Sequence, residues 1–375
     1  MIQPYIPDTL PLKNIDWERH VSLIGKANAA LARYDGILLG MVNPQVLLSP
    51  LTTREAVLSS RIEGTQASLE EVLQYEADVG DPEKNQVQPD SPQIHDIHEI
   101  INYRKAMGTA VEKMAGRPFG INTIRELHRI LLAGVRGRYK DPGEIRRNQN
   151  YIASPGTPID QATFIPPSPE IIMDALSNWE DYLYETEKDP LVQLAILKAQ
   201  FELIHPFRDG NGRIGRMLVP IILYRKKILS QPMFYISSYL ERNRDVYYER
   251  LLAISKDGDW NGWISFFLEA LVLQSEENSK KARAILELYN GMKTRVTKIT
   301  RSQYSIQTID VLFSSPIINS SDFSIKSGIP DRTAQRIIQK LEQDGILRMI
   351  RKGSGSRSPT YLFLDLLDIT ENEED

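Results

Sequence analysis

Twelve consecutive residues of this chain, HPFRDGNGRIGR from His205 to Arg216, gather side chains that could do chemistry on a phosphate. Gly210 and Gly212 let the backbone approach a ligand closely and present N–H groups to an anion. A helix is expected to begin there, so its positive dipole end adds to the same site. Arg213 and Arg216 are three residues apart and therefore share one helical face. This pattern favours binding of a polyanion.

Two further side chains of the stretch suggest a reaction rather than binding alone. Asp209 beside an anion site is explained if a divalent cation bridges it to phosphate oxygens, as Mg²⁺ does in phosphate enzymes. His205 is the only histidine of the stretch, and with an ordinary pKa of about 6.5 it can accept a proton near pH 7. A base, a metal carboxylate, an anion nest and two arginines together suit attack of a hydroxyl on a nucleotide phosphate.

Two other interpretations of the stretch are open at this point. Gly210-x-Gly212-x-x-Gly215 matches the dinucleotide fingerprint, which needs a strand before it and an acid about 20 residues after it. The preceding residues 191–204 have the length of a helix, and tyrosine and serine stand near residue 235. The second alternative is a structural turn in which His205 only caps the preceding helix.

The stretch resembles the signature of the Fic family, His-Pro-Phe-x-Asp/Glu-Gly-Asn-Gly-Arg-x-x-Arg, at every fixed position, and the resemblance covers roughly residues 50–275. It implies a protein adenylyltransferase that moves AMP from ATP to a Ser, Thr or Tyr hydroxyl of a target protein and of itself. His205 would deprotonate that hydroxyl, Asp209 would hold Mg²⁺, and Arg216 would bind the γ-phosphate. The implied anion hole consists of Gly210, Asn211, Gly212 and Arg213. Relatives that move a phosphate group carry lysine where this chain has Gly212, so the glycine favours AMP transfer.

Two other segments resemble parts of the family's ATP site. Residues 142–146, PGEIR, resemble the approach to its flap, a hairpin that covers the nucleotide and pairs with the target backbone. Short strands are expected at residues 150–153 and 162–165 around a Pro-Gly turn. The implied ATP contacts of the flap are Asn150, Tyr151, Ile152 and Ala153, where the family commonly has glycine at the last position. Asn243 and Tyr247, followed by Tyr248, resemble residues that flank the adenosine, although paired tyrosines on a helix are often core.

Residues 59–64, SSRIEG, match the family's inhibitory pattern Ser/Thr-x-x-x-Glu-Gly/Asn through Ser59, Glu63 and Gly64. The resemblance implies that Glu63 forms a bidentate pair with Arg216 and withholds it from the γ-phosphate, so that ATP binds with its α-phosphate misaligned. Inhibition is then expected within one molecule or across a homodimer. The alternative is structural, because Ser60-x-x-Glu63 also matches a capping box and Gly64 an ordinary helix C-cap.

Helical periodicity dominates the rest of the chain. Residues 78–92 are polar and proline-bearing, which predicts a loop, and Ser68 opens a capping box with Glu71. Helices are expected over residues 21–34, 52–63, from 68 onward, 93–115, 121–134, 169–185, 190–204, 213–228, 243–255, 260–275 and, as a long charged connection, 275–297.

The C-terminal section has a different pattern. Two short helices at 321–327 and 331–344 are followed by apolar runs at 346–350 and 360–364, which is the order of a winged helix. Residues 326–357 carry eight Lys or Arg against three Asp or Glu. The tail from Thr370 is acidic and expected to be frayed. The basic positions are Arg332, Arg336 and Lys340 on one helical face, and Arg351, Lys352 and Arg357 in the wing.

This section supports a rival hypothesis, a DNA-binding transcriptional regulator with weak DNA binding through the winged helix. Winged helices also dock proteins, so the fold alone does not assign a function. The intact His205 and Asp209 favour the enzyme, because a scaffold needs neither. The predicted fold class is mainly α: a Fic-type helical core with a short β-hairpin flap and a C-terminal winged-helix domain. The predicted domains are an N-terminal helical region at 1–90, the catalytic core at 91–275, a connecting helix at 276–298 and the winged helix at 299–370.

Composition narrows the classes further. The 375 residues carry a net charge of −4, so any nucleic-acid surface has to be local. No cysteine is present, which excludes disulfides, thiol nucleophiles and thiolate zinc sites. The N-terminus has no signal-peptide pattern, and the apolar run at 218–224 is too short for a membrane span. A cytoplasmic location without a membrane partner is expected.

Overall fold

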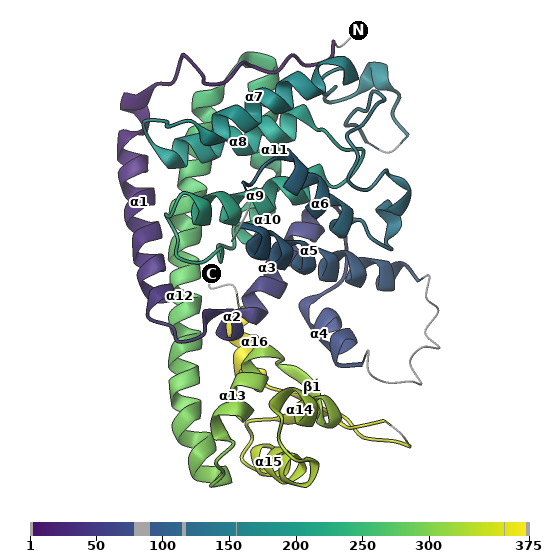
Figure 1. The fold of residues 1–375 in the computed structure, drawn as a ribbon, viewed down its shortest axis with the longest axis vertical. Coiled ribbons are helices and arrows are strands. Elements are labelled where there is room, and N and C mark those ends of the chain that lie inside the picture. Colours follow the sequence, from purple (N-terminus) through teal and green to yellow (C-terminus); the bar gives the residue numbers. More distant parts are fainter. Residues whose placement is uncertain (1–2, 79–90, 115–117, 155, 356, 373–375) are drawn as a thin grey trace. The chain divides into compact units, whose positions relative to one another are not determined.

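The computed structural model describes residues 3–78, 91–114, 118–154, 156–355 and 357–372, and helices make up most of them (Figure 1). Most of the loop expected at 78–92 lies outside the described residues. The first elements are α1 (Trp17–Leu39), α2 (Pro44–Leu47), α3 (Ser49–Ile62), α4 (Leu69–Asp78), α5 (Pro92–Met114) and α6 (Ile121–Leu131). Three 3₁₀ turns follow: η2 (Arg136–Tyr139), η3 (Ile159–Gln161) and η4 (Pro169–Ile171). The next helices are α7 (Ile172–Tyr184), α8 (Pro190–Ile204), α9 (Asn211–Arg225), α10 (Ser237–Arg242), α11 (Arg244–Asp257) and α12 (Trp260–Thr300).

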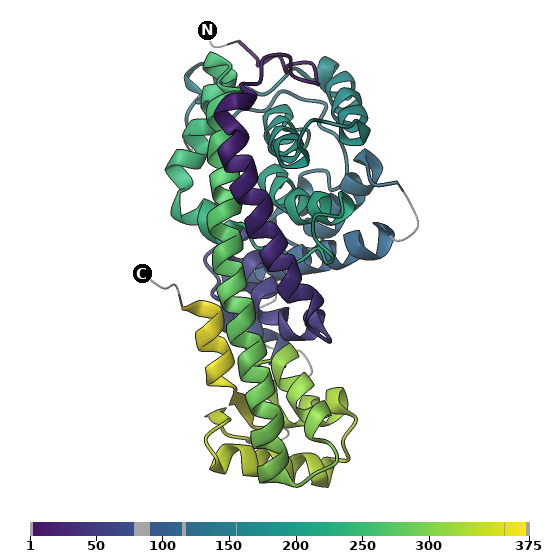
Figure 2. The same cartoon turned by 90° about the vertical axis from the view of Figure 1, so that its left-hand side faces the viewer.

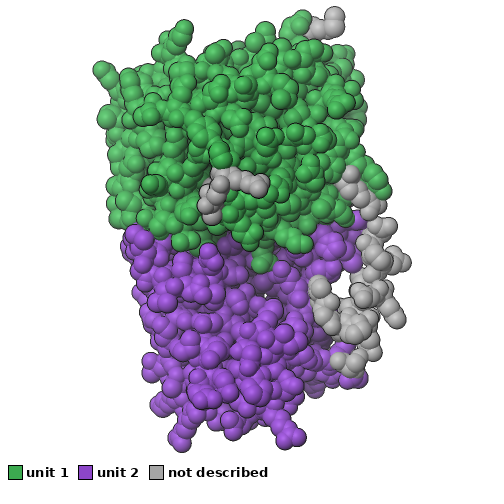
Figure 3. All heavy atoms as spheres, viewed as in Figure 1, with its two compact units in different colours: residues 1–35, 58–64, 102–276 green, residues 36–57, 65–101, 277–375 purple. Residues whose placement is uncertain are grey.

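The chain forms two compact units, coloured separately in Figure 3. Unit 1 contains residues 1–35, 58–64 and 102–276, and unit 2 contains residues 36–57, 65–101 and 277–375. Helices α1, α3, α5 and α12 each contribute residues to both units. The division into four domains made from the sequence stays a prediction.

Helix α8 forms the centre of unit 1, because every residue from Leu191 to Ile204 is buried. A helix that is buried around its whole circumference must be covered on all sides, and α7 and α9 both pack against it. Its first turn is fixed by Asp189, whose carboxylate accepts hydrogen bonds from the backbone N–H groups of Leu191 and Val192. The stretch predicted to carry the chemistry therefore connects two central helices, α8 and α9.

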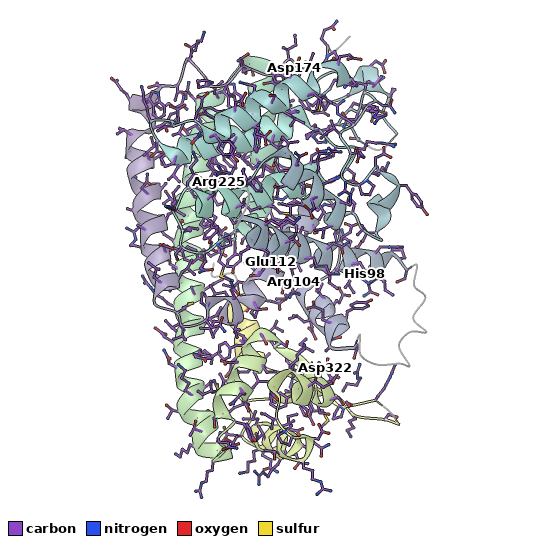
Figure 4. All side chains as sticks on the ribbon, in the orientation of Figure 1. His98, Arg104, Glu112, Asp174, Arg225 and Asp322 are labelled. Atoms are coloured by element: carbon purple, nitrogen blue, oxygen red, sulfur yellow. The ribbon has the colours of Figure 1, made fainter. Side chains whose placement is uncertain are left out.

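A single helix of 41 residues, α12, replaces the two helices expected at 260–275 and 275–297. No proline interrupts residues 260–300, and the helix accommodates Gly291. It therefore continues through residue 275, where a division was predicted. In unit 1, α1 runs beside the first turns of α12 (Figure 2), where the His20 ring lies 3.1 Å from Asn261 Oδ1. Arg225, labelled in Figure 4, ends α9 with its guanidinium 4.1 Å from the centre of the Tyr184 ring.

The two strands expected in the flap are wrong as strands. The structure has one antiparallel bridge there, between Ile152 and Phe164, with Ile152 N–H donating to the Phe164 carbonyl at 2.8 Å. The segment between them contains the 3₁₀ turn η3, and Pro166 and Pro167 lack the N–H groups that a longer ladder would need. The flap is consequently a loop closed by a single bridge.

Local signals around the predicted inhibitory helix α3 are confirmed in part. The helix ends at Ile62, and Gly64 has a φ of 99°, a left-handed conformation that favours glycine. The capping box before α4 forms in both directions, since Ser68 N–H donates to Glu71 at 2.8 Å and Glu71 N–H donates to the Ser68 hydroxyl at 3.2 Å. The alternative box at Ser60 and Glu63 is wrong, because the buried Ser60 hydroxyl has no partner among the described residues.

The last elements all belong to unit 2: α13 (Ser305–Ser314), β1 (Ile317–Asn319), α14 (Ser320–Ser327), α15 (Asp331–Gln343), β2 (Arg348–Arg351), β3 (Thr360–Leu362) and α16 (Leu364–Glu371). The two helices and two strands expected here are present. The sheet has a third strand, β1, which was not predicted, in the antiparallel order β1-β3-β2. Thr370, expected in a frayed tail, is fully buried in α16, and its carbonyl accepts from the Lys281 ammonium at 2.8 Å.

Helix α4 packs against this C-terminal sheet within unit 2. The Asn319 amide of β1 donates to the Ala77 carbonyl, and the Arg351 guanidinium of β2 donates to both carboxylate oxygens of Asp78. Asp78 is almost fully buried. Across the described ranges of the chain, no helix combines the length and apolarity needed to cross a membrane.

Candidate active site

A cavity of 790 Å³ opens in unit 1 where α8 ends and α9 begins. Seven of the residues predicted for the site line it: Glu63, Ile152, Ala153, His205, Gly212, Arg216 and Tyr247. Tyr248, which the sequence analysis paired with Tyr247, lines it too. The lining also includes residues that the sequence analysis did not assign: Ser154, Thr163, Phe164, Glu202, Leu203, Arg244, Asp245, Glu249, Leu251 and Leu252. The remaining predicted residues lie outside the lining and are placed individually below.

The backbone and ring of His205 are held by hydrogen bonds that leave ring nitrogen Nε2 with a lone pair. Its backbone caps α8 in a left-handed conformation with φ 51° and ψ 58°, and its N–H donates to the Phe201 carbonyl at 3.1 Å. His205 is thus the C-cap of α8, as the structural alternative predicted, and its side chain also lines the cavity. Ring atom Nδ1 lies 3.1 Å from the Glu202 carbonyl, which can only accept, so Nδ1 carries the proton and Nε2 a lone pair. Burial lowers the pKa of His205, which keeps it neutral.

The loop after His205 is closed on itself. The Asn211 amide accepts from Phe207 N–H at 2.9 Å and donates to the Phe207 carbonyl at 2.8 Å, so its side chain is structural. Gly210 has a φ of 79° and precedes the first turn of α9. The opening N–H groups of a helix have no partners inside it, so those of Asn211, Gly212 and Arg213 make the start of α9 a candidate anion-binding terminus. The dinucleotide alternative is excluded, because a helix and not a strand precedes the glycines.

Asp209 is the predicted metal carboxylate, and its surroundings fit Mg²⁺. Its Oδ1 accepts from Gly210 N–H at 2.6 Å and from Arg213 at 3.3 Å, whereas Oδ2 accepts no hydrogen bond from the described residues. The side chain is 42% exposed. Among the described residues no cluster of three metal-ligating side chains exists. A single open carboxylate suits Mg²⁺, which is held in such sites by one or two carboxylates together with substrate phosphates.

Arg216 is fully buried and bound to the predicted inhibitory helix. Its Nη2 donates to Glu63 Oε1 at 2.7 Å and to the Ser59 carbonyl at 2.8 Å, while Nε donates to the Ser59 hydroxyl at 2.8 Å. The bidentate pair expected between Glu63 and Arg216 is wrong: the carboxylate accepts one hydrogen bond, from Nη2, and Ser59 holds the Nε side of the guanidinium. Nη1 is buried and has no partner among the described residues. Gly64 ends the segment and does not line the cavity.

The Glu63 carboxylate stands directly over the anion-binding terminus. Burial favours its protonated form, but the charge and hydrogen bond of Arg216, with the charge of Arg213, outweigh burial and hold the pKa of Glu63 below its ordinary value. A Cβ atom on Gly212 would lie 2.2 Å from Glu63 Oε1. Glycine is therefore required at this position for the carboxylate to lie where it does.

Two of the four flap residues predicted to contact ATP line the cavity. Ile152 and Ala153 line the cavity, whereas Tyr151 is exposed and outside the lining. Asn150 also lies outside it, and its amide donates to the Phe207 carbonyl at 3.3 Å. This bond links the flap to the loop that carries His205.

Residues 21–112 match the Fic/DOC family N-terminal region, and residues 118–223, which include the loop and most of the cavity, match the Fic/DOC family itself. This chain belongs to the Fic/DOC family.

Relatives of this Fic chain include the Protein adenylyltransferase Fic of Drosophila willistoni, 29% identical over 190 residues, and the Protein adenylyltransferase fic-1 of Caenorhabditis elegans, 35% identical over 111 residues. These alignments cover 48% and 28% of this chain, but only 33% and 19% of the relatives. A Fic family protein from Desulfovibrio desulfuricans G20 has the same fold over 100% of both chains, with a TM-score of 0.59 at 19% identity. Residues 134–508 of C. elegans Fic-1 match with a TM-score of 0.51 at 22% identity, over 72% of this chain and 73% of that one.

The two residues predicted to flank the adenosine, Asn243 and Tyr247, lie in different places in the Fic chain. Asn243 lies between α10 and α11 outside the cavity lining, and its amide donates to the Tyr239 carbonyl at 2.9 Å. Tyr247 reaches the lining from a fully buried position, and its hydroxyl donates to Glu202 at 2.5 Å. The Lys198 ammonium, also fully buried, donates to that hydroxyl at 2.7 Å and lies 3.0 Å from the Glu202 carboxylate. The signal for this cluster was a lysine and a glutamate four residues apart, the two charged residues of a mostly apolar helix.

His128 of α6 packs against the loop that follows His205, and nothing in the sequence singled it out. Its ring is fully buried and stacks on Phe207 with the ring centres 3.8 Å apart. Gly143 N–H donates to Nδ1 at 2.7 Å, so the proton resides on Nε2, which donates to the Asp209 carbonyl at 2.9 Å. A neutral imidazole is required by both bonds, and burial lowers the pKa of His128 to about 4.

This depressed pKa predicts a specific loss of stability in acid. The unfolded chain binds a proton at His128 near pH 6.5, whereas the folded chain resists it until about pH 4. The free energy of unfolding should therefore fall as the pH drops through this window, by about 3 kcal/mol for this one group. Urea unfolding at both ends of the window measures it. His128→Gln, which cannot be protonated, should lose about 3 kcal/mol less than the wild type, and His98→Gln serves as the control. Equal losses in wild type and His128→Gln would contradict the assignment.

Proposed function

We propose that this Fic chain is a protein adenylyltransferase that moves AMP from ATP to a Ser, Thr or Tyr hydroxyl of a target protein and of itself. The observation that carries the proposal is the neutral His205, whose Nε2 lone pair lies in the same cavity as the anion-binding terminus of α9 and Arg216. Relatives over parts of the chain are named protein adenylyltransferases, which supports the same reaction.

In the proposed reaction, His205 Nε2 takes the proton of the acceptor hydroxyl. The hydroxyl oxygen attacks the α-phosphorus of ATP, the bond from that phosphorus to the bridging oxygen breaks, and pyrophosphate leaves. The N–H groups at the start of α9 and the Arg213 guanidinium stabilise the charge that develops on the phosphate oxygens. Nδ1–H donation to the Glu202 carbonyl keeps the ring in the required tautomer and orientation.

Asp209 would hold Mg²⁺ on the ATP phosphates through its open Oδ2 atom. The ion would supply neutralisation of phosphate charge. Arg213 donates to Oδ1 of the same carboxylate at 3.3 Å, so this side chain keeps Asp209 oriented toward the start of α9.

Autoinhibition by Glu63 is the second part of the proposal. Its carboxylate occupies the space above Gly212 and bonds Arg216, the residue proposed for the γ-phosphate. A negative charge there repels the γ-phosphate and leaves ATP bound with its α-phosphate misplaced for in-line attack. The contact lies within one unit of one chain, which supports inhibition in the single molecule; a homodimer is not needed for it.

The decisive experiment uses ATP labelled on the α-phosphate with Mg²⁺, with and without Glu63→Gly. We expect label to become covalently attached to protein, and mass spectrometry to find AMP on a hydroxyl residue. Label from the γ-phosphate should not be incorporated. Incorporation of γ-label instead would replace AMP transfer with phosphate transfer.

A second candidate function, weak DNA binding, is favoured by one observation in unit 2. Arg332 and Arg336 on α15 are both exposed and share a face. Two other residues predicted for this surface bind groups of the protein itself. Lys340 donates to the carbonyls of Ile299 and Thr300, and Arg351 pairs with Asp78. The basic surface is therefore smaller than the sequence predicted. A protein-docking role for the same elements is the alternative.

Binding of the full chain to duplex DNA should be weak and steeply salt-dependent. Arg332, Arg336 and the exposed Lys352 would make about three phosphate contacts, which predict a slope of about −3 for the logarithm of the affinity against the logarithm of the salt concentration. Replacing both Arg332 and Arg336 with glutamine should flatten the slope by about two, whereas Arg283→Gln, at an exposed position of α12, should leave it unchanged. Fluorescence anisotropy across a salt series gives these slopes. Absence of binding at low salt would remove DNA from the partners.

A further inference from the structure

Arg146 is a buried arginine whose partners are backbone carbonyls. It is 3% exposed. Its Nε donates to the His205 carbonyl at 2.9 Å, Nη1 donates to Asn148 at 3.1 Å, and Nη2 donates to Pro167 at 2.5 Å. Its own N–H donates to the Pro206 carbonyl at 2.9 Å. Among the described residues no carboxylate pairs with it, and burial lowers the pKa of Arg146 to about 10.

The carbonyls that Arg146 binds belong to two parts of the candidate site. The carbonyl of His205 stands at the C-terminal end of α8, where helix carbonyls lack partners inside the helix. His205 is also one of four non-glycine residues with positive φ in the described chain, a conformation that persists only where its surroundings enforce it. Asn148 and Pro167 flank the flap, residues 150–165, on its two sides. One guanidinium therefore binds the residue proposed as the base and both ends of the flap.

We infer that Arg146 is a positioning residue that holds His205 and the two flanks of the flap in one fixed arrangement. The inference rests on the proposed role of His205 as the base. Because the flap lines the same cavity, its distance from His205 sets where an acceptor hydroxyl lies relative to Nε2. A displacement of about 1 Å at such a point can lower a rate about a hundredfold.

The chemistry of the side chain explains why arginine stands here. Its planar guanidinium carries five N–H donors in a fixed fork and can bind several separated carbonyls at once. A lysine offers three donors from one nitrogen and cannot span the same groups. Arg146→Lys keeps the charge and removes the fork, so it separates geometry from electrostatics.

The test compares Arg146→Lys and Arg146→Gln with Arg147→Gln, a matched control at the neighbouring exposed arginine. Hydrogen exchange of the protein without nucleotide is the first measurement, since it does not depend on any reaction. Both Arg146 variants should exchange about tenfold faster in residues 150–165 and 202–208, with the middle of α8 unchanged. Arg147→Gln should match the wild type. Unchanged exchange, or an increase spread evenly over α8 and α9, would overturn the inference.

The second measurement is the rate of AMP transfer in the Glu63→Gly background. We expect kcat to fall about tenfold in Arg146→Lys and about a hundredfold in Arg146→Gln, while the Kd for ATP changes less than about threefold. Faster local exchange with an unchanged kcat would also overturn the inference. If the parent Glu63→Gly protein transfers no AMP, the proposed function fails, and the exchange result still decides whether Arg146 fixes the flap to His205.

Discussion

His205→Ala should lower the rate of AMP transfer by about 10² to 10⁴ while ATP still binds. The ring presents Nε2 as a base because Nδ1–H is held by the Glu202 carbonyl and because burial lowers the pKa of His205. The groups proposed for the phosphates, at the start of α9, keep their own contacts when the ring is removed. Transfer is measured with ATP labelled on the α-phosphate, and binding by calorimetry.

The left-handed backbone conformation of His205 decides which second substitution is suitable at this position. A φ of 51° is tolerated by asparagine better than by most residues, so His205→Asn removes the base with the smallest disturbance of the α8 end. His98→Ala, at a part-buried histidine that does not line the cavity, controls for loss of an imidazole. Both His205 variants should be inactive and the control active. Full labelling by folded His205→Asn would exclude His205 as the base.

Glu63→Gly should raise AMP transfer by about a hundredfold, because it frees Arg216 for the γ-phosphate and lets the α-phosphate move into line. The carboxylate now bonds Arg216 at 2.7 Å and stands over Gly212, where the phosphates are proposed to lie. Ser59 would keep two hydrogen bonds to the guanidinium, so Arg216 should stay in place without Glu63. Initial rates of α-label incorporation at saturating ATP measure the gain.

Two further variants separate release of inhibition from loosening of the helix end. Arg216→Ala in the Glu63→Gly background should cancel the gain, since both side chains are proposed to act on the same phosphate. Arg61→Gly introduces the same flexibility in the last turn of α3 at an exposed residue and should leave the rate unchanged. A flat rate in Glu63→Gly with only a lower melting temperature would make Glu63 a structural group at the helix end.

Helix α4 follows the proposed inhibitory segment in the sequence. Helix α4 begins five residues after Gly64, and within unit 2 its last residue, Asp78, is bound to Arg351 of the C-terminal sheet. A module made of residues 299–375 alone would lack this helix. Experiments on the basic surface of α15 are for this reason designed on the full chain.

Features fixed by neighbouring residues were predictable from the sequence. The capping box at Ser68 and Glu71, the helix end at Gly64 and the start of α9 at its glycines depend on contacts within a few residues, and they form where predicted. The dense motif between His205 and Arg216 likewise placed the cavity, because its groups lie on one loop and one helical turn. Whether each of these residues has its predicted role stays a prediction.

Errors arose where the outcome depended on distant residues or on chain continuity. The 41-residue helix α12 was divided into two because helical periodicity does not state where a helix ends when no proline or cap is present. The flap was predicted as strands because its residues suit strands, yet ladder length depends on how many N–H groups meet partners across the turn. Strand β1 was missed because three residues carry too little pattern, and only pairing with β3 defines them.

The sequence by itself determined the helical class and the family resemblance and named the candidate reactive groups, since each depends on residue type and short spacing. Only the tertiary structure decided which residues these groups contact. It divided the Arg216 guanidinium between Glu63 and Ser59, placed neutral His128 beneath the loop, and bound His205 to both ends of the flap through Arg146. The partners of Arg216, of His128 and of the His205 carbonyl in these contacts lie between 59 and 157 residues away in the sequence, so no local pattern encodes them, and packing around α8 brings them within hydrogen-bonding distance.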